Sequence, residues 1–564
     1  MALRVLLYCD DPGYGGTAVN AGLLATGFAR HGFVVAVAAT ANPVDGPSDI
    51  PFYRIDYDTQ AFQEKSRNSR NEPEAILLAF RPDVVLFCDS TPDGSLAAKR
   101  VCADWGLAYV VLVNYVAAGQ IAAMEAARQE VARTLDAALA LVAVSEDNLA
   151  LLGQEFGVSR QNARVIHNGR PAQWFETADM ARRQALRGAL GLSPDDVLVV
   201  TVARYEARKG YRHLLEAITS LKARALVSGL YFVWIGQDVD GGAQALRTAV
   251  ARSGLEDRIL VTGERHDVRD WLAAADMFVL PSESEGMPLS LIEAMGQGVP
   301  VLATRVGGIP ELLGDAGVLL PDPSEDAEAM TMALAGALQH LAASPWRRQD
   351  LGNAGRRRAL QQFQADSMIA AYVDLLYGLG LRQDRPSQSM PPVADYRPPH
   401  LVAEGRKMAW GVPGESIEFL KEGWSHAEGT GRWTQGTRAR CCFALPQALA
   451  RGFVLTLEAC PFLGNADGRL ETALWVNGRE KACLVWKDSN AVRRVELAIT
   501  LDDAPCLQVA FEFRLQGVSS PASHGMSDDG RLLGLHIAWV RLERLQEATH
   551  AVRTGKPTTG QAGG

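Results

Sequence analysis

The sequence predicts an α/β protein with two Rossmann-like domains, followed by an all-β sandwich domain. Apolar strand-like runs alternate with helical stretches over residues 4–380, and this alternation is typical of doubly wound parallel sheets. The alternation breaks near 175–195 and then restarts, which indicates two separate sheets. After residue 415 the pattern changes to short alternating strands with Gly, Asp and Pro turns, which favours a β-sandwich.

The individual strands can be assigned from their apolar runs. The second domain is expected to end with a helix near 365–380. In the first domain a helix near 17–30 should follow a Gly-rich turn after the first strand. The strands expected in the two domains are 4–10, 33–40, 83–89, 108–114 and 140–145, and then 197–203, 231–236, 259–263, 277–282 and 299–304.

Chain length supports several domains, because 564 residues far exceed the roughly 250–300 at which one core stops growing. The Pro- and Ser-rich stretch after the second domain is predicted to be a linker. The predicted boundaries are 1–180 and 181–380 for the Rossmann-like domains, 381–412 for the linker, 413–546 for the sandwich and 547–564 for a disordered tail.

Composition and charge narrow the class of protein. The formal net charge of −9 and the pI near 5.7 argue against a general nucleic-acid binder, which would normally carry a basic domain. No apolar run reaches the ~20 residues that span a bilayer, and the first residues resemble a strand more than a signal peptide. The eight cysteines form no Cys-x-x-Cys motif, which favours reduced thiols. We therefore expect a cytoplasmic protein with, at most, peripheral membrane contact.

Two loops at predicted strand ends could bind an anion, since open α/β sheets bind ligands beyond the carboxyl ends of their strands. Gly15 and Gly16 precede a helix, where free N–H groups favour an anion, although the turn could need glycine only for its dihedral angles. Arg204 ends a strand, and Lys209 and Gly210 open the next helix. Two cations beside a helix start suit a diphosphate, and the alternative is a solvated basic turn.

A third loop, residues 282–298, reads SESEGMPLSLIEAMGQG and carries two spaced carboxylates. Glu285 should precede a helix. A carboxylate at that position interacts favourably with the helix dipole, by ~0.3–1 kcal/mol, so Glu285 needs no ligand to account for it. Glu293 should lie in the second helical turn among apolar neighbours, where a carboxylate needs a partner. Ligand hydroxyls would be suitable partners. A fourth element, Asn168–Gly169, is by itself only a turn signal.

Taken together, these loops resemble those of retaining glycosyltransferases of the GT-B fold, specifically glycosyltransferase family four. Residues 267–313 carry the most specific part of the resemblance, which covers roughly residues 1–380. The family's Glu-x₇-Glu, Arg…Lys-Gly, Gly-Gly and Asn-Gly motifs match, in that order, Glu285 with Glu293, Arg204 with Lys209–Gly210, Gly15–Gly16, and Asn168–Gly169.

The resemblance implies a UDP-, GDP- or other nucleotide-sugar donor in the second Rossmann-like domain. It implies that Arg204 and Lys209 hold the diphosphate, that Glu285 contacts the transferred sugar and that Glu293 binds the ribose. Arginine and lysine side chains would neutralise the diphosphate in place of a metal ion. No Asp-x-Asp motif is positioned to bind a metal, so no cofactor is expected. Further donor contacts implied by the motifs are Gly15, Gly16, Gly210, Gly286, Met287, Pro288 and Leu289.

One position departs from the family. Many members carry a histidine where this chain has Asn114. An asparagine can hydrogen-bond a sugar hydroxyl but cannot take up a proton. Asn114 and Asn168 are therefore expected as candidate contacts to the acceptor or the sugar.

The predicted function is retaining transfer of a hexose-type sugar to a saccharide, glycoconjugate or protein hydroxyl. The alternative is a catalytically weak or silent GT-B protein that acts as a glycan-binding or scaffolding module. Asn114 and the β-domain motivate this alternative, since segments 423–433 and 519–534 resemble accessory domains of bacterial glycosyltransferases. Trp424 and Trp433 could stack on sugar rings, or they could simply belong to the sandwich core.

Overall fold

The computed structural model forms two compact units, residues 1–69 with 82–389 and residues 70–81 with 390–564. The predicted linker and tail lie almost wholly outside the described residues, as does most of segment 519–534. The structure describes residues 2–11, 15–44, 50–55, 70–117, 124–176 and 179–381, and then the β-strands and adjoining residues between 408 and 544.

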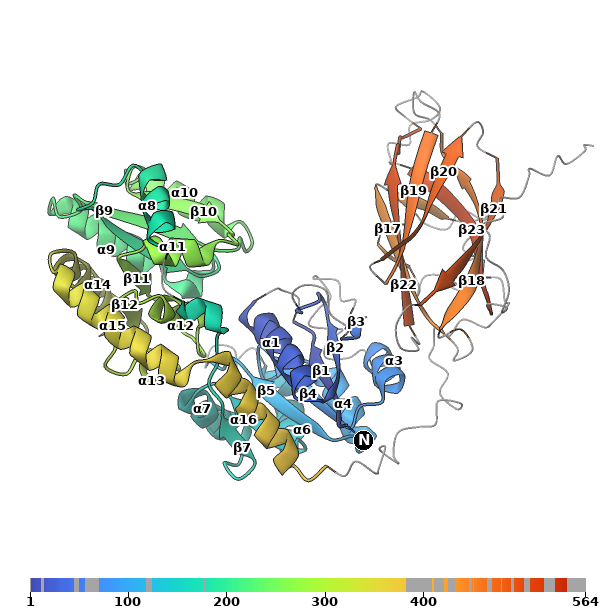
Figure 1. Ribbon diagram of the computed structural model, residues 1–564, viewed down its shortest axis with the longest axis horizontal. Helices are drawn as coiled ribbons and strands as arrows, with labels where there is room; N and C mark the ends of the chain where they lie inside the picture. Colours follow the sequence, from blue (N-terminus) through green and yellow to red (C-terminus); the bar gives the residue numbers. More distant parts are fainter. Residues whose placement is uncertain are drawn as a thin grey trace, which may run out of the picture. The chain divides into compact units, whose positions relative to one another are not determined.

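The first sheet has seven parallel strands in the order β3-β2-β1-β4-β5-β6-β7 (Figure 1). Its central strands are buried along nearly their whole length, as expected for a parallel sheet covered on both faces. The strands are β1 (Arg4–Cys9), β2 (Val34–Ala39), β3 (Phe52–Arg54), β4 (Val84–Asp89), β5 (Tyr109–Val113), β6 (Ala140–Ala143) and β7 (Ala163–Val165).

Helices connect these strands along the chain. The Ser145 side chain caps α7 by accepting a hydrogen bond from the Asn148 N–H. The last helix before the linker, α16 (Ala365–Gly378), packs back against α1 of the first sheet, where Gly27 leaves room for Ile369. The other helices are α1 (Gly16–Arg30), α3 (Asn71–Phe80), α4 (Leu96–Asp104), η1 (Glu125–Ala127), α6 (Arg128–Asp136), α7 (Glu146–Phe156) and η2 (Ala172–Phe175).

The second sheet has six parallel strands in the order β10-β9-β8-β11-β12-β13. The strands are β8 (Val197–Val202), β9 (Leu230–Ile235), β10 (Ile259–Gly263), β11 (Met277–Leu280), β12 (Val301–Thr304) and β13 (Val318–Leu320). The helices are α8 (Met180–Ala189), η3 (Ala207–Lys209), α9 (Tyr211–Ala223), α10 (Gly242–Arg252), α11 (Val268–Ala274), α12 (Leu289–Gly296), α13 (Ile309–Leu313), α14 (Ala327–Ala342) and α15 (Pro345–Gln362).

The C-terminal region consists of two antiparallel sheets. One has the order β14-β23-β18-β21, with β16 beside β23, and the other has the order β15-β17-β22-β19-β20. Side chains of both sheets share one core, for example Leu455 and Phe513. The strands are β14 (Met408–Ala409), β15 (Leu420–Glu422), β16 (Arg432–Gln435), β17 (Arg438–Ala444), β18 (Gly452–Pro461), β19 (Arg469–Val476), β20 (Arg479–Lys487), β21 (Arg493–Thr500), β22 (Gln508–Gln516) and β23 (Leu533–Arg544).

The two tryptophans proposed for sugar stacking are both half-buried. Trp424 packs against the sandwich core with its ring edge-on to Phe513. Trp433 contacts the rings of Phe462 and His536. These contacts favour a packing role for both residues.

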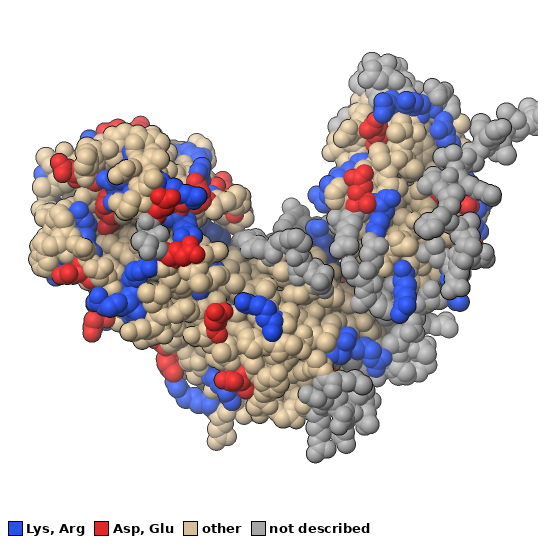
Figure 2. All heavy atoms as spheres, viewed as in Figure 1, with Lys and Arg blue, Asp and Glu red and all other residues tan. Residues whose placement is uncertain are grey.

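The fold class is confirmed, with two parallel Rossmann-like sheets and two antiparallel sheets. The short strands β3, β13, β14, β15 and β16 were not expected, because a run of two to four residues carries little periodic signal. The nine-residue strand β20 was also missed. Acidic and basic side chains are interspersed over residues 1–389 on the face drawn in Figure 2. Among the described residues, no helix is long and apolar enough to cross a membrane.

Candidate active site

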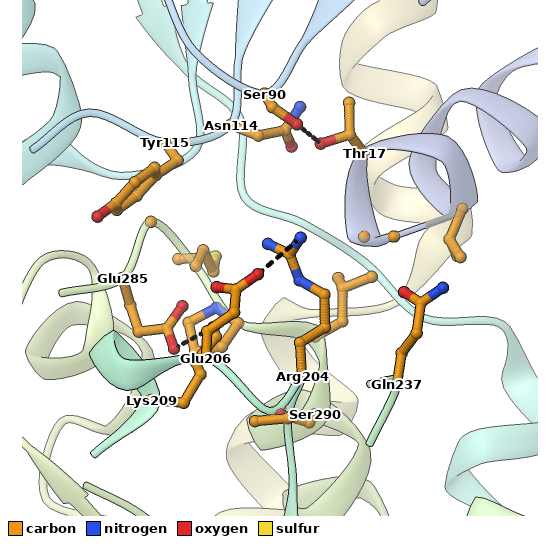
Figure 3. A pocket seen from close by; sticks show the side chains of 18 of the residues that line it. Thr17, Ser90, Asn114, Tyr115, Arg204, Glu206, Lys209, Gln237, Glu285 and Ser290 are labelled. Atoms are coloured by element: carbon orange, nitrogen blue, oxygen red, sulfur yellow. Dashed lines mark hydrogen bonds and ion pairs between the residues drawn. The ribbon is translucent and has the colours of Figure 1, made fainter. Parts of the chain in front are cut away.

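A cavity of about 850 Å³ lies at the carboxyl ends of both parallel sheets (Figure 3). Loops that follow β1, β4 and β5 form one wall, and loops that follow β8, β9, β10 and β11 form the other. The cavity therefore has the position expected for ligands of open α/β sheets. Its polar lining includes Asp11, Thr17, Ser90, Asn114, Tyr115, Arg170, Arg204, Glu206, Arg208, Lys209, Gln237, Glu285 and Glu293.

Three cations converge on the wall formed by the second sheet. Arg204 follows β8 by two residues, and Arg208 and Lys209 belong to the 3₁₀ turn η3 before α9. Gly210 ends this turn at φ +72°, and a Cβ there would lie 1.8 Å from the carbonyl oxygen of Pro281. Glycine at this position therefore lets the basic turn pack tightly against the end of β11.

Lys209 and Glu285 form a buried ion pair at the floor of the cavity, with 2.6 Å between Nζ and Oε1. The Ser282 hydroxyl donates a second hydrogen bond to the same Oε1, at 2.7 Å. Burial alone would raise the pKa of Glu285, but Lys209, Arg208 and the Ser282 hydroxyl outweigh it and leave that pKa lowered. Burial lowers the pKa of Lys209, and the Glu285 carboxylate opposes this shift. The two side chains thus oppose the effect of burial on each other's pKa.

Glu293 lies in the second turn of α12, as predicted, but its partner is a protein side chain. Arg170 Nη2 lies 2.8 Å from Glu293 Oε1, and both side chains are about nine-tenths buried. The Arg170 guanidinium also stacks on the Trp174 ring, 4.7 Å from its centroid. Burial raises the pKa of Glu293, and Arg170 opposes that shift. Arg170 from the first half therefore supplies the charged partner that Glu293 was expected to need, and the contact of Glu293 with ribose hydroxyls stays a prediction.

Gly286 brings the two walls together. A Cβ on Gly286 would lie 1.9 Å from the carbonyl oxygen of Asn114, which belongs to the opposite wall. The Gly286 carbonyl in turn accepts a hydrogen bond from the Gly308 N–H, at 2.8 Å. This loop therefore has backbone contacts on both sides and little freedom to move aside.

Replacing Gly286 by alanine is expected to lower the free energy of unfolding by about 1–3 kcal/mol, because the new methyl group overlaps backbone. Urea unfolding measures the loss. Gly336→Ala on α14 is the matched control, since a Cβ there meets nothing within 4 Å. The control should be neutral or gain up to about 1 kcal/mol from helix propensity. Equal behaviour of the two variants would contradict the close approach.

Four asparagines link the walls behind the cavity. Asn20 donates from Nδ2 to Oδ1 of Asn168 at 2.7 Å and, at 3.4 Å, to Oδ1 of Asn114. Asn168 donates to the Met287 carbonyl at 2.9 Å, and Asn114 donates to the Asp89 carbonyl at 3.0 Å. The fourth, Asn148, donates to the Asn114 carbonyl at 3.3 Å. Both polar ends of Asn168 thus have protein partners, while the carbonyl of Asn114 has only a long contact.

Tyr115 and Arg208 make a further contact across the cavity. The Arg208 guanidinium lies over the Tyr115 ring, 4.9 Å from its centroid. The Tyr115 hydroxyl lies 2.5 Å from the Ser284 hydroxyl of the opposite wall. On the same wall as Tyr115, the Ser90 hydroxyl is close to the Thr17 hydroxyl, at 2.8 Å, and donates to Asp11. Hydroxyl and carboxylate groups thus dominate this part of the wall.

All but one of the residues predicted for the site line the cavity. Gly210 lies outside the lining and acts through packing. Pro288 precedes α12 as its N-cap residue, in extended conformation. The lining residues are Gly15, Gly16, Asn114, Asn168, Arg204, Lys209, Glu285, Gly286, Met287, Pro288, Leu289 and Glu293.

Sequence reasoning missed several charged or aromatic residues that line the cavity, among them Tyr115, Arg170, Glu206 and Arg208. Arg208 and Glu206 stand in the same loop as Arg204 and Lys209, so loop position was the available signal. Nothing in the sequence around Tyr115 or Arg170 distinguishes them, because their roles depend on contacts with the other half. In the described residues, no three His, Cys, Asp or Glu side chains gather as a group that could hold a metal ion.

Two Rossmann-like halves with a ligand cavity between them define the GT-B class of fold. Comparison with protein families identifies two matches, "Glycosyltransferase Family 4" over residues 14–174 and "Glycosyl transferases group 1" over residues 196–340. Residues 14–340 therefore belong to the group 1 glycosyltransferases of family four.

Related proteins agree with this assignment. The α-maltose-1-phosphate synthase of Mycobacterium tuberculosis is 32% identical over 212 residues, which is 35% of this chain and 52% of that protein. The D-inositol 3-phosphate glycosyltransferase of Streptomyces bingchenggensis is 30% identical over 250 residues, 42% of this chain and 52% of that protein. The chain thus spans about half the length of these relatives.

Solved structures share the fold of this unit. Anabaena HepE in complex with UDP-glucose superposes with a TM-score of 0.53 and 18% identity, over 67% of this chain and all of that one. The sucrose-phosphate synthase of Thermosynechococcus elongatus gives a TM-score of 0.57 and 20% identity, over 67% of this chain and 99% of that one.

Proposed function

We propose that this protein transfers a sugar from a nucleoside diphosphate sugar to an acceptor hydroxyl, with retention of the anomeric configuration. The observation that carries the proposal is the convergence of Arg204, Arg208 and Lys209 on one cavity wall beside the buried carboxylate of Glu285. Guanidinium and ammonium groups suit a diphosphate, and a fixed carboxylate suits the hydroxyls of a sugar.

In the proposed reaction the bond between the anomeric carbon and the diphosphate oxygen breaks. Arg204 and Lys209 stabilise the negative charge that develops on the leaving diphosphate, which is the kind of electrostatic effect that dominates much enzyme catalysis. The acceptor oxygen forms the new bond to the anomeric carbon from the same face. Its proton passes to an oxygen of the leaving phosphate, so the reaction is balanced without a protein base.

Such a route does not depend on a histidine at position 114. The Asn114 side chain lines the cavity, and its amide donates to the Asp89 carbonyl. Its carbonyl oxygen, with only a 3.4 Å contact to Asn20, can accept a hydrogen bond from a sugar or acceptor hydroxyl. We therefore favour an active enzyme over the catalytically silent alternative.

The donor and the acceptor are proposed only by class. UDP-glucose is the first donor to test, because HepE, which shares this fold, has been solved with that compound. The cavity wall formed by the first sheet carries Thr17, Ser90 and Asp11. Their side chains could hydrogen-bond the hydroxyls of a saccharide, a glycoconjugate or a protein side chain.

The test is to incubate the full chain with UDP-, GDP-, ADP- and dTDP-sugars and to follow nucleotide release, with and without EDTA. We expect turnover with one nucleotide class, undiminished by EDTA because three side-chain cations neutralise the diphosphate. Proton NMR of the product should show the anomeric configuration of the donor. If no nucleotide sugar reacts and no nucleotide raises the melting temperature, the enzyme proposal fails.

A further inference from the structure

Glu206 occupies the position between two of the three cations of the proposed diphosphate site. Its Oε1 lies 2.8 Å from Nη1 of Arg204, and its Oε2 lies 2.8 Å from Nε of Arg208. Figure 3 shows the Glu206 carboxylate and the Arg204 guanidinium meeting in the cavity. Each oxygen of the carboxylate thus satisfies a different guanidinium group, as two oxygens of a phosphate would.

The three cavity glutamates that form ion pairs, Glu206, Glu285 and Glu293, differ in how firmly they are held. The side chain of Glu285 is 6% exposed and is fixed by Lys209 and Ser282. The side chain of Glu293 is 10% exposed, against an equally buried Arg170. Glu206 is the most open of the three, at 17%, and Arg204, which it pairs with, is 47% exposed. Glu206 is therefore the carboxylate that can leave its partners for water at least cost.

A diphosphate could not bind Arg204 and Arg208 fully while Glu206 holds them. The two anions would compete for the same N–H donors and would repel each other at short range. The chain also allows an exchange, since Glu206 precedes η3 and is in extended conformation, with φ −117° and ψ 148°. Rotation of its side chain alone would free both guanidinium groups.

We infer that Glu206 is an internal competitor for the diphosphate, which occupies Arg204 and Arg208 in the empty site and is displaced by the donor. This inference rests on the proposed function. It assigns to Glu206 a role in setting the affinity of the site for the donor. Without ligand, Glu206 offsets part of the positive charge of Arg204 and Arg208. After transfer it recaptures the arginines and so favours release of the nucleoside diphosphate.

The test compares binding of UDP, GDP and ADP, and of the matching uncharged nucleosides, to wild type and to Glu206→Gln by calorimetry. The glutamine keeps the size of the side chain but removes its charge. We expect the variant to bind the preferred diphosphate about 3- to 10-fold more tightly, because a partly exposed ion pair is worth only a small free energy. Binding of the nucleoside should stay unchanged, because it carries no charge.

Glu264→Gln is the matched control, because Glu264 lines the same cavity and within the described residues forms no ion pair with Arg204 or Arg208. It should alter diphosphate binding less than 2-fold by general charge alone. Diphosphate binding that is unchanged or weaker in Glu206→Gln overturns the inference, since Glu206 would then only orient the arginines. If neither wild type nor variant binds any diphosphate, the proposed function itself fails, and the two failures are thereby distinguished.

Discussion

Lys209→Met is expected to reduce sugar transfer by about 10²- to 10³-fold, the range typical of losing one preorganised stabilising group. Methionine keeps most of the side-chain volume but removes the ammonium group that lies 2.6 Å from Glu285. The loss should fall on kcat, because the charge to be stabilised develops on the leaving diphosphate. Initial rates at saturating donor measure this effect.

A structural role of the same pair can be separated from its catalytic role. Lys209→Met leaves Glu285 buried without its closest cation, and breaking a buried pair costs about 3–5 kcal/mol. The double variant Lys209→Met/Glu285→Gln removes both charges and should recover most of this stability. Its activity should stay low. Recovery of activity together with stability would show that Lys209 acts only through the fold.

Arg170→Met should lower the free energy of unfolding by about 3–5 kcal/mol at neutral pH, because Glu293 then becomes an unpaired buried carboxylate. The double variant Arg170→Met/Glu293→Gln should be close to wild type in stability, and urea unfolding measures all three proteins. If Arg170→Met and the double variant are equally destabilised, the ion pair is not the source of the effect.

The loss in Arg170→Met should also depend on pH. Burial raises the pKa of Glu293 above its ordinary value of 4.5, and Arg170 is the group that opposes this. A carboxyl group whose pKa is raised on folding favours the folded protein at low pH. This contribution to the free energy of unfolding is lost as pH rises through the folded pKa. The deficit of the variant should therefore be smallest below the ordinary carboxyl pKa and should grow as pH rises through the raised folded pKa toward neutral pH. A deficit that is constant with pH would contradict the assignment.

Local sequence patterns determined much of this protein. Long apolar runs predicted the central strands of both parallel sheets, because a strand buried on both faces needs near-continuous apolar residues. Glycines and basic residues at strand ends predicted where the cavity lies and part of its lining, since parallel strands present their carboxyl ends at one edge. The short strands β3 and β13 were missed, as three residues carry no usable period.

Glu285 and Glu293 show the division between sequence and tertiary structure. Their seven-residue spacing and their places before and within α12 followed from local signals such as Gly286 and Pro288. The sequence alone could not reveal that Arg170 neutralises Glu293 or that Glu206 occupies two arginines of the site. Pairing of charges depends on distance in space and on the exclusion of water, and both arise only when the two Rossmann-like halves fold around one cavity.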